Sequence, residues 1–527
     1  MASNLYSYTP VDSNASEIRI AQINPAENKN DPINCHLIHV SLDDKPSYKA
    51  LSYTWGKETA CIPVTIDGKS AMLTPNLDAA LKRLRPKDKP LLIWVDFICI
   101  DQSNLVERSA QAAKMRNVYK QAENVCVWLG LADEKSERAW RLIELLVDGS
   151  EGAIAAIVSD SSRLENFEAL KVLFRRPYWW RIWVVQEVNC GRENGREVEV
   201  FCGERSITWR GLLSMSANME SIKEHLVRSV YPNDPTSIFS LMGGGPRGLH
   251  LTKFSESHEP QLLELLYSHM SKFSTDPKDK VYALIGVSSS RETFGPTDYT
   301  RSIHDAYIHT AWHIISTTKS LDVICASQND DNIYDLPSWV PDWERRRVHP
   351  NHRVIGLHIR EAFNAAGDSL AEFSFSNDHK ILNAQGFVVD SLKEVSSSFY
   401  MEGDHHAESK VIQTLHAFEE WWNLYASCKG TDPAAQEVFR RTFCGGDWHA
   451  VYDIHHMKRL QIFCALHRKL LPDIGFTPPP FEDSSVVENE EDQRATVSAA
   501  NLRMHGKCLA ISSSARLNST ILPQNNQ

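Results

Sequence analysis

Residues 91–130 read LLIWVDFICIDQSNLVERSAQAAKMRNVYKQAENVCVWLG, and this stretch decides the fold class. The first five residues are all apolar and of strand length, which is typical of a central strand covered on both faces. From about Glu107 apolar side chains recur at helical spacing, and VCVWLG at 125–130 indicates a second buried strand closed by a glycine. A strand, a helix and a strand with short connections predict a parallel sheet with helices on both faces.

The residues before this stretch add strands and a hairpin. Residues 17–23 and 35–42 have the pattern of half-buried strands, and YKALSYTW continues as a third strand that ends at Gly56. Asp67 and Gly68 stand between IPVTI and KSAML, and this dipeptide supplies the positive φ values that a type I′ hairpin turn requires. We therefore expect an α/β fold with a mainly parallel sheet flanked by helices, an inserted β-hairpin and a largely helical region after it.

The composition excludes several classes of protein. The 527 residues include 67 acidic and 56 basic side chains, and the resulting net charge of −11 argues against nucleic acid as a partner. The 11 cysteines show no CxxC spacing, which fits a reducing compartment and neither a disulfide framework nor a zinc site. The first residues lack the basic and apolar regions of a signal peptide, and the most hydrophobic run contains Asp96. We expect a cytoplasmic protein without a membrane span.

Aromatic and acidic side chains follow two strands of the predicted sheet. Tyr53, Trp55 and Gly56 come at the end of one strand, and Asp96 comes directly after the apolar run 91–95. Ligand-binding groups collect just beyond the carboxyl ends of parallel strands, so these residues are candidates for substrate binding. Alternatives stay open, since a glycine after a strand often only forms a turn, and an acid at this position also serves to anchor the loop and helix that follow.

Two further groups of residues suggest chemistry that the sequence favours less. Cys99 lies near Asp96, but no histidine accompanies it in the strongest motifs, and we interpret it as a buried structural cysteine. His449, Asp453 and His456 share one helical face and have side chains that suit zinc. We interpret this face as solvated and predict no metal site.

The chain after the sheet reads as a series of smaller segments. In DPKDKVYALIG at 276–286, Asp276 is the expected helix N-cap, Pro277 the first helical residue and Gly286 the stop. We expect the following division of the chain: N-terminal strands at 1–48 that pack on the main domain, the main domain at 49–211, a helical extension at 212–345, a mixed and mostly helical region at 346–475, an acidic, proline-rich linker at 476–497 and a short β tail at 498–527.

Five blocks of sequence occur in an order that resembles a known family. They are YKALSYTWG, the IDG hairpin, LTPNLDAALKRLR, the stretch from LIWVDFICID to VCVWLG, and RRPYWWRIWVVQEV. Together they resemble the fungal heterokaryon incompatibility (HET) domain over about residues 49–211, and DPKDKVYALIG and LPSWVPDW resemble the region that commonly follows it. The resemblance implies an effector or signalling module of fungal nonself recognition, in which HET domains trigger growth arrest or programmed cell death when incompatible cells fuse.

HET domains are also regarded as distantly similar to Toll/interleukin-1 receptor (TIR) domains. Some TIR domains hydrolyse NAD with one glutamate, which follows a tryptophan by four residues on a helix, and others act only as assembly modules. The segment WVVQE places Trp183 four residues before Glu187. The resemblance implies that Glu187 is the catalytic glutamate and that Trp183 forms the floor of a pocket lined by Tyr53, Trp55 and Asp96.

A carboxylate suits this chemistry, because cleavage of the nicotinamide–ribose bond develops an oxocarbenium-like centre while the leaving pyridinium is already cationic. NAD would be the substrate, and no cofactor is expected. Against this, Arg175, Arg176 and Arg181 lie nearby in sequence, and an acid near arginines more often forms a structural ion pair. The enzymatic hypothesis therefore stays open beside a non-enzymatic one, a scaffold that binds protein partners or a second copy of itself.

Overall fold

The computed structural model describes most of the chain up to residue 344 and short parts beyond it. The chain divides into two compact units, of which the first comprises 1–230, 238–346 and 368–383 and the second 231–237, 347–367 and 384–527. The predicted linker at 476–497 and the face with His449, Asp453 and His456 lie outside the described residues, as do most of the predicted region 346–475 and all but three residues of the tail at 498–527. The described residues are 5–12, 15–56, 58–159, 164–222, 226, 241, 244–250, 259–326, 332–344, 369–386, 392–395, 416, 419–428, 430, 432, 435 and 510–512.

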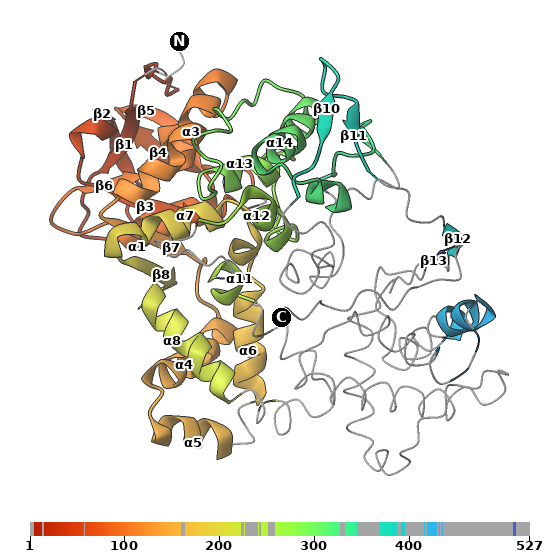
Figure 1. The fold of residues 1–527 in the computed structure, drawn as a ribbon. Coiled ribbons are helices and arrows are strands. Elements are labelled where there is room, and N and C mark those ends of the chain that lie inside the picture. The colour runs from red at the N-terminus through yellow and green to blue at the C-terminus, as the bar shows by residue number, and fades with distance from the viewer. Residues whose placement is uncertain are drawn as a thin grey trace. The chain divides into compact units, whose positions relative to one another are not determined.

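A nine-stranded sheet forms the centre of the first unit (Figure 1). Its strands lie in the order β5-β4-β2-β1-β6-β3-β7-β8-β9. Their bounds are β1 (Glu17–Ile23), β2 (Asn34–Ser41), β3 (Lys49–Tyr53), β4 (Ile62–Ile66), β5 (Lys69–Leu73), β6 (Leu91–Trp94), β7 (Asn124–Trp128), β8 (Val198–Cys202) and β9 (Arg205–Thr208).

The parallel strands lie at the centre of the sheet. Strands β6, β3, β7 and β8 run parallel to one another, because helices connect them. Strand β1 is antiparallel to both β6 and β2, and β9 is antiparallel to β8. The predicted α/β class, with a parallel core flanked by helices and followed by a helical region, is confirmed, and antiparallel strands extend this core on both sides.

The predicted hairpin is confirmed at one edge of the sheet. Strands β4 and β5 pair antiparallel with Ile66 opposite Lys69, so that two residues form the turn. Asp67 has a φ of 50° and Gly68 a φ of 75°, the left-handed values that a type I′ turn requires. The hairpin joins the sheet through a short parallel pairing of β4 with β2.

Side-chain caps determine where several helices begin. The Thr74 hydroxyl accepts a hydrogen bond from the backbone of Leu77 at the start of α1, and the Asn104 side chain accepts from Val106 and Glu107 at the start of α3. The helices that follow or cover the strands are α1 (Pro75–Leu84), α2 (Asp96–Cys99), α3 (Leu105–Gln121), α4 (Glu134–Asp148), α5 (Glu151–Ser159), α6 (Leu164–Phe174), η3 (Pro177–Trp180), α7 (Val184–Gly191), η4 (Glu193–Gly195) and α8 (Trp209–Ser221).

Helix α7 packs directly on the sheet. It contacts β3, β7 and α3, and all eight of its residues are buried. At Gly191 a Cβ atom would lie 2.4 Å from Cγ2 of Val125 on β7, a distance that real Cβ atoms do not reach. Glycine at this position therefore lets α7 pack closely on β7, and this packing holds α7, which carries Glu187, against the sheet.

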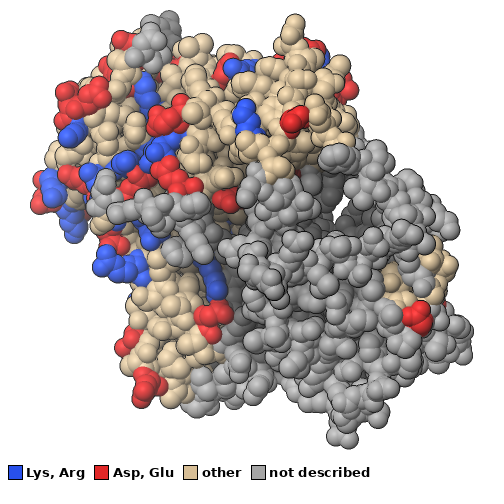
Figure 2. Space-filling view, in the orientation of Figure 1, with Lys and Arg blue, Asp and Glu red and all other residues tan. Residues whose placement is uncertain are grey.

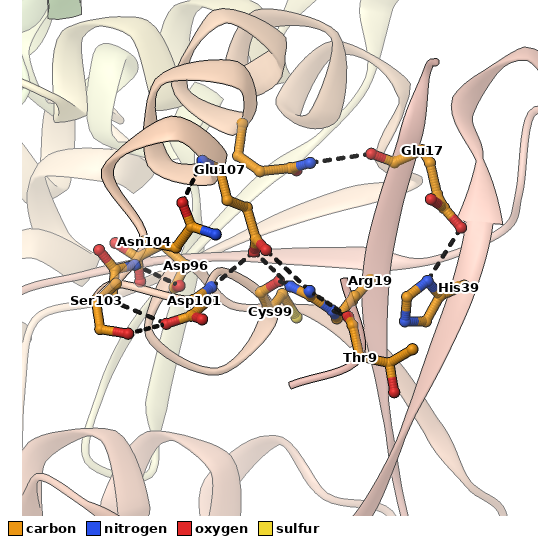
Figure 3. A network of polar contacts seen from close by, with 12 residues as sticks. Thr9, Glu17, Arg19, His39, Asp96, Cys99, Asp101, Ser103, Asn104 and Glu107 are labelled. Carbon is orange, nitrogen blue, oxygen red and sulfur yellow. Dashed lines mark hydrogen bonds and ion pairs between the residues drawn. The ribbon is translucent and has the colours of Figure 1, made fainter. Parts of the chain in front are cut away.

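A buried ion pair joins the first strand to the third helix (Figure 3). The guanidinium of Arg19 on β1 donates to both carboxylate oxygens of Glu107 on α3, at 2.5 and 3.0 Å, and to the carbonyl of Cys99 at 3.0 Å. Glu107 also accepts a hydrogen bond of 2.8 Å from the backbone of Asp101. Arg19 is fully buried and Glu107 is 4% exposed, so these contacts take the place of water for both charges.

Further helices continue the first unit after the sheet. They are α11 (Arg247–His250), α12 (Leu262–Ser268), α13 (Asp279–Ile285), α14 (Ile303–Thr318) and η6 (Asp322–Ala326), followed by the paired strands β10 (Phe373–Phe375) and β11 (Leu382–Ala384). The start of α13 was predicted at Pro277, and this was wrong. The Asp276 carboxylate accepts a hydrogen bond from the backbone of Lys278 in a turn, and the helix begins only at Asp279; its end before Gly286 agrees with the prediction.

Little of the second unit is described. Strands β12 (Leu392–Val395) and β13 (Ala510–Ser512) pair antiparallel in it, and residues 419–428 are helical. Within the described part of the chain, no helix combines the length and the apolar character that crossing a membrane requires.

Candidate functional site

The residues predicted at the strand ends lie together. Tyr53 is the last residue of β3, Trp55 follows it, and Asp96 begins α2 just after β6. The indole N–H of Trp55 donates to Oδ2 of Asp96 at 2.9 Å, and this bond joins the ends of the two strands. The indole ring also packs edge to face on Phe97, with ring centroids 5.2 Å apart.

Asp96 is held by several donors in a buried position. Its Oδ1 accepts a hydrogen bond of 2.7 Å from the backbone of Phe97, and its carbonyl accepts one of 2.9 Å from the side chain of Gln102. Burial raises the pKa of the Asp96 carboxyl, while Arg181 and the Trp55 indole oppose this change. The Tyr53 hydroxyl has no hydrogen bond of ordinary geometry, although it lies close enough to Asp96 to favour its charged form.

Gly56 serves the turn after the third strand. Its φ of 84° lies in the left-handed region, which explains why a glycine stands there. It is exposed, and a Cβ atom at this position would meet only one atom within 4 Å, a backbone nitrogen at 3.9 Å. The conformation of the chain, rather than close packing, requires glycine here.

Glu187 lies on helix α7, beside the end of strand β3. It is 1% exposed, and the Ser52 hydroxyl on β3 donates to its Oε2. The hydroxyl of Tyr178 is in turn 2.8 Å from Oγ of Ser52. Burial raises the pKa of Glu187 to about 7, and Arg181 and the Ser52 hydrogen bond limit this rise. The carboxyl group can therefore take up or release a proton near neutral pH.

Arg181 joins the two acidic groups. Its Nη1 lies 3.8 Å from Oε1 of Glu187 and also donates to the carbonyl of Tyr53. The charge of Arg181 interacts favourably with Asp96 as well, and its side chain is 22% exposed. We call Ser52, Tyr53, Asp96, Tyr178, Arg181 and Glu187 the Glu187 cluster. Two buried carboxyl groups, one guanidinium and three hydroxyls make up its polar groups.

Trp183 has a different partner from Glu187. It occupies the N-cap position of α7 and is half-buried, and its indole lies close enough to Asp279 in the helical extension to favour the charged form of that carboxyl group. Glu187 instead bonds to Ser52 on the sheet. The role of Trp183 as the floor of a pocket therefore stays a prediction, and its observed contact links α7 to the extension.

The sequence did not point to Ser52 or Tyr178, and it pointed to Arg181 only as a structural ion-pair partner. Ser52 carries a fully buried hydroxyl in β3, and such a group must find a partner. Tyr178 and Arg181 belong to the block RRPYWWRIWVVQEV. The hydroxyl of Ser52 could thus have marked this position as part of a polar site. Its partners could not be identified from sequence spacing, because they lie 126 and 135 residues away.

The charged residues on the described part of the face in Figure 2 do not form a single-sign surface. Acidic and basic side chains are interspersed over the described part of the face in Figure 2. Within the described residues, no group of three or more histidine, cysteine or acidic side chains is arranged to hold a metal ion. The chemistry that the cluster itself offers is proton transfer and the stabilisation of a developing positive charge by a carboxylate.

The residues of this site lie in a part of the chain that matches a known family. Residues 48–187 match the model of the heterokaryon incompatibility protein (HET) family. The chain carries a HET domain. The matched residues include all six members of the Glu187 cluster and end at Glu187 itself, so the HET domain holds the whole cluster but not the extension.

One relative extends the similarity beyond the HET domain. The chain is 26% identical over 470 residues to heterokaryon incompatibility protein 6, OR allele, of Neurospora crassa, and the similarity covers 75% of this chain and 67% of the relative. No solved structure shows significant similarity to the chain.

Proposed function

We propose that this HET-domain protein acts in fungal heterokaryon incompatibility, as a signalling effector that promotes growth arrest or programmed cell death. The observation that carries the proposal is the HET domain at 48–187. The relative from Neurospora crassa bears the name of an incompatibility protein, and its similarity reaches beyond the domain.

The Glu187 cluster supports a role for this domain beyond folding. Burying carboxyl groups beside one arginine costs stability compared with apolar side chains of similar size. Strongly shifted pKa values also gather at functional sites more often than elsewhere, although structural ion pairs show them too. A glutamate with a pKa of about 7 at the carboxyl ends of parallel strands therefore makes this cluster the part of the HET domain on which we expect the function to depend.

Expression of the full chain in a filamentous fungus tests the effector role. We expect induction of the wild-type chain to stop colony extension and to admit a vital dye into the cells. The Glu187→Gln variant should lose most of this effect, while Arg210→Met, a change of an exposed arginine on α8, should keep it. If the wild-type chain accumulates as folded protein and colonies extend at the normal rate, the effector role is wrong.

A second candidate function is the cleavage of NAD by Glu187. The favouring observation is that a buried carboxyl group with a pKa near neutrality lies beside Arg181 and accepts a hydrogen bond from Ser52, which would orient a carboxylate. In this reaction the nicotinamide–ribose bond breaks with its electron pair leaving on nicotinamide. Glu187 stabilises the ribosyl cation, and water adds to give ADP-ribose and a proton.

Purified full chain incubated with NAD tests this candidate. We expect the wild type and Arg210→Met to release nicotinamide, measured by chromatography, and Glu187→Gln to be slower by at least about 100-fold. The assay is run over a range of protein concentrations, with the mass of the particles measured in parallel. Self-association without release of nicotinamide would refute the catalytic candidate and would favour the non-enzymatic scaffold.

A further inference from the structure

The helical extension holds the backbone on which Arg181 lies. Phe273, between α12 and α13, forms a parallel bridge with Arg181. The backbone of Ile182 donates to the carbonyl of Phe273 at 2.9 Å, and the backbone of Phe273 donates to the carbonyl of Trp180 at 2.5 Å. These two bonds enclose Arg181 from both sides along the chain, so the position of the loop at 270–273 sets the position of the Arg181 backbone.

A buried lysine of the same loop makes a third contact. Nζ of Lys272 donates to the carbonyl of Trp179 at 2.8 Å, and the side chain is 6% exposed. Within the described part of the chain, no carboxylate lies within ion-pair distance of it. The loop is therefore bound to three consecutive peptide units before α7. Lys272 makes its contact in a buried position, where removal from water disfavours the charged ammonium group.

A second buried lysine fixes the loop itself. Lys280 on α13 is 2% exposed, and its Nζ donates to the carbonyl of Met270 at 2.7 Å and to the carbonyl of Lys272. Helix α13 is anchored in turn, because Arg116 on α3 donates to the carbonyl of Gly286 at 2.7 Å. Hydrogen bonds thus lead from α13 through the loop to the backbone on both sides of Arg181. The side chain of Arg181 then forms an ion pair with Glu187 at 3.8 Å.

We propose that Lys280 and Lys272 are positioning residues of the Glu187 cluster, which hold the loop at 270–273 so that its backbone clamps Arg181 beside Glu187. This gives a role to Lys280, the second lysine of the DPKDKVYALIG segment, which lies outside the matched residues 48–187. The inference rests on the proposed role of the Glu187 cluster. A shift of the extension would loosen the contact between Arg181 and Glu187, so the extension controls a site to which it contributes no side chain of the cluster.

Hydrogen exchange of the full chain tests the clamp without reference to activity. In Lys280→Met we expect the amides of residues 179–187 to exchange at least about tenfold faster than in the wild type, with helices α4 and α8 unchanged. Lys280→Arg keeps the charge and should restore most of the protection. Lys135→Met, a change of an exposed lysine on α4, should have no effect. Unchanged exchange of 179–187 in both Lys280→Met and Lys272→Met overturns the proposal.

The growth assay shows whether the clamp matters for function. We expect Lys280→Met to lose growth arrest at normal protein levels and Lys280→Arg to recover it. If Lys280→Met exchanges faster yet arrests growth fully, while Glu187→Gln does not, the positioning role is wrong and the proposed function stands. If Glu187→Gln itself arrests growth fully, the proposed role of the cluster fails, and the exchange data alone then decide whether the clamp exists. Should Lys280→Met not fold, Lys272→Met and Lys280→Arg carry the same comparison.

Discussion

Replacement of Arg19 by methionine is expected to lower the free energy of unfolding of the first unit by about 3 to 5 kcal/mol. The change leaves Glu107, 4% exposed, without the guanidinium that contacts both of its oxygens. It also removes the donor to the carbonyl of Cys99. A buried carboxylate that loses its ion-pair partner costs far more than a surface ion pair contributes, and β1 lies inside the sheet between β2 and β6.

Two further variants make this expectation specific. Arg205→Met removes an arginine that is 44% exposed and pairs with Glu137 and Glu144, and it should cost about 1 kcal/mol or less. The double change of Arg19→Met with Glu107→Leu replaces the buried pair by apolar side chains and should recover much of the lost stability. Urea unfolding followed by tryptophan fluorescence measures all three. Equal losses for Arg19→Met and Arg205→Met would show that the buried pair does not hold β1 in place.

The sequence predicted the parts of the fold that depend on local patterns. The run at 91–95, the Asp67-Gly68 turn and the helix expected from about Glu107 were all found, although that helix begins at Leu105. Apolar spacing and turn residues are properties of neighbouring residues and can be read from the sequence. The place of β1 between β2 and β6 was not predicted, since the pairing of distant strands depends on packing across the whole sheet. The start of α13 was missed because Asp276 caps a turn instead of a helix.

The candidate site, like the fold, was predicted only in part. Tyr53, Trp55 and Asp96 were expected together because the ends of parallel strands meet at one edge. Ser52 and its contact with Glu187 were not expected, because that contact joins residues 135 positions apart. The buried state of Lys280 was missed as well, since lysine is among the residues least often buried and its backbone acceptors cannot be read from spacing.

Replacement of Arg181 by methionine is expected to destabilise the protein strongly at pH 8 and weakly at pH 5. Arg181 is the guanidinium beside both Glu187 and Asp96, and at pH 8 its loss leaves two buried carboxylates without their cation. The expected loss in the free energy of unfolding is about 3 to 5 kcal/mol at that pH. At pH 5 protons neutralise Glu187, whose pKa is about 7, and the missing cation then matters less.

The pH window follows from the direction of the pKa shifts. Glu187 has a folded pKa of about 7 against an ordinary value of 4.5, so the folded state binds more protons between these values and the stability falls as the pH rises through them. Arg181 lowers the Glu187 pKa, and its removal raises that pKa further. The window of falling stability then extends above pH 7. The difference between the wild type and Arg181→Met should therefore grow as the pH rises beyond about 7.

The double variant Arg181→Met with Glu187→Gln separates this mechanism from a simple loss of packing. Glutamine keeps the size of Glu187 but carries no charge, so the double variant should lose most of the steep pH dependence while keeping the loss of the Arg181 stem contacts. Arg210→Met, an exposed arginine on α8, should show neither effect. Unfolding curves at pH 5, 6, 7 and 8 measure the difference. If Arg181→Met loses the same stability at every pH, then Arg181 acts through its contacts with the chain, such as the carbonyl of Tyr53, and the charge balance of the cluster is not what it maintains.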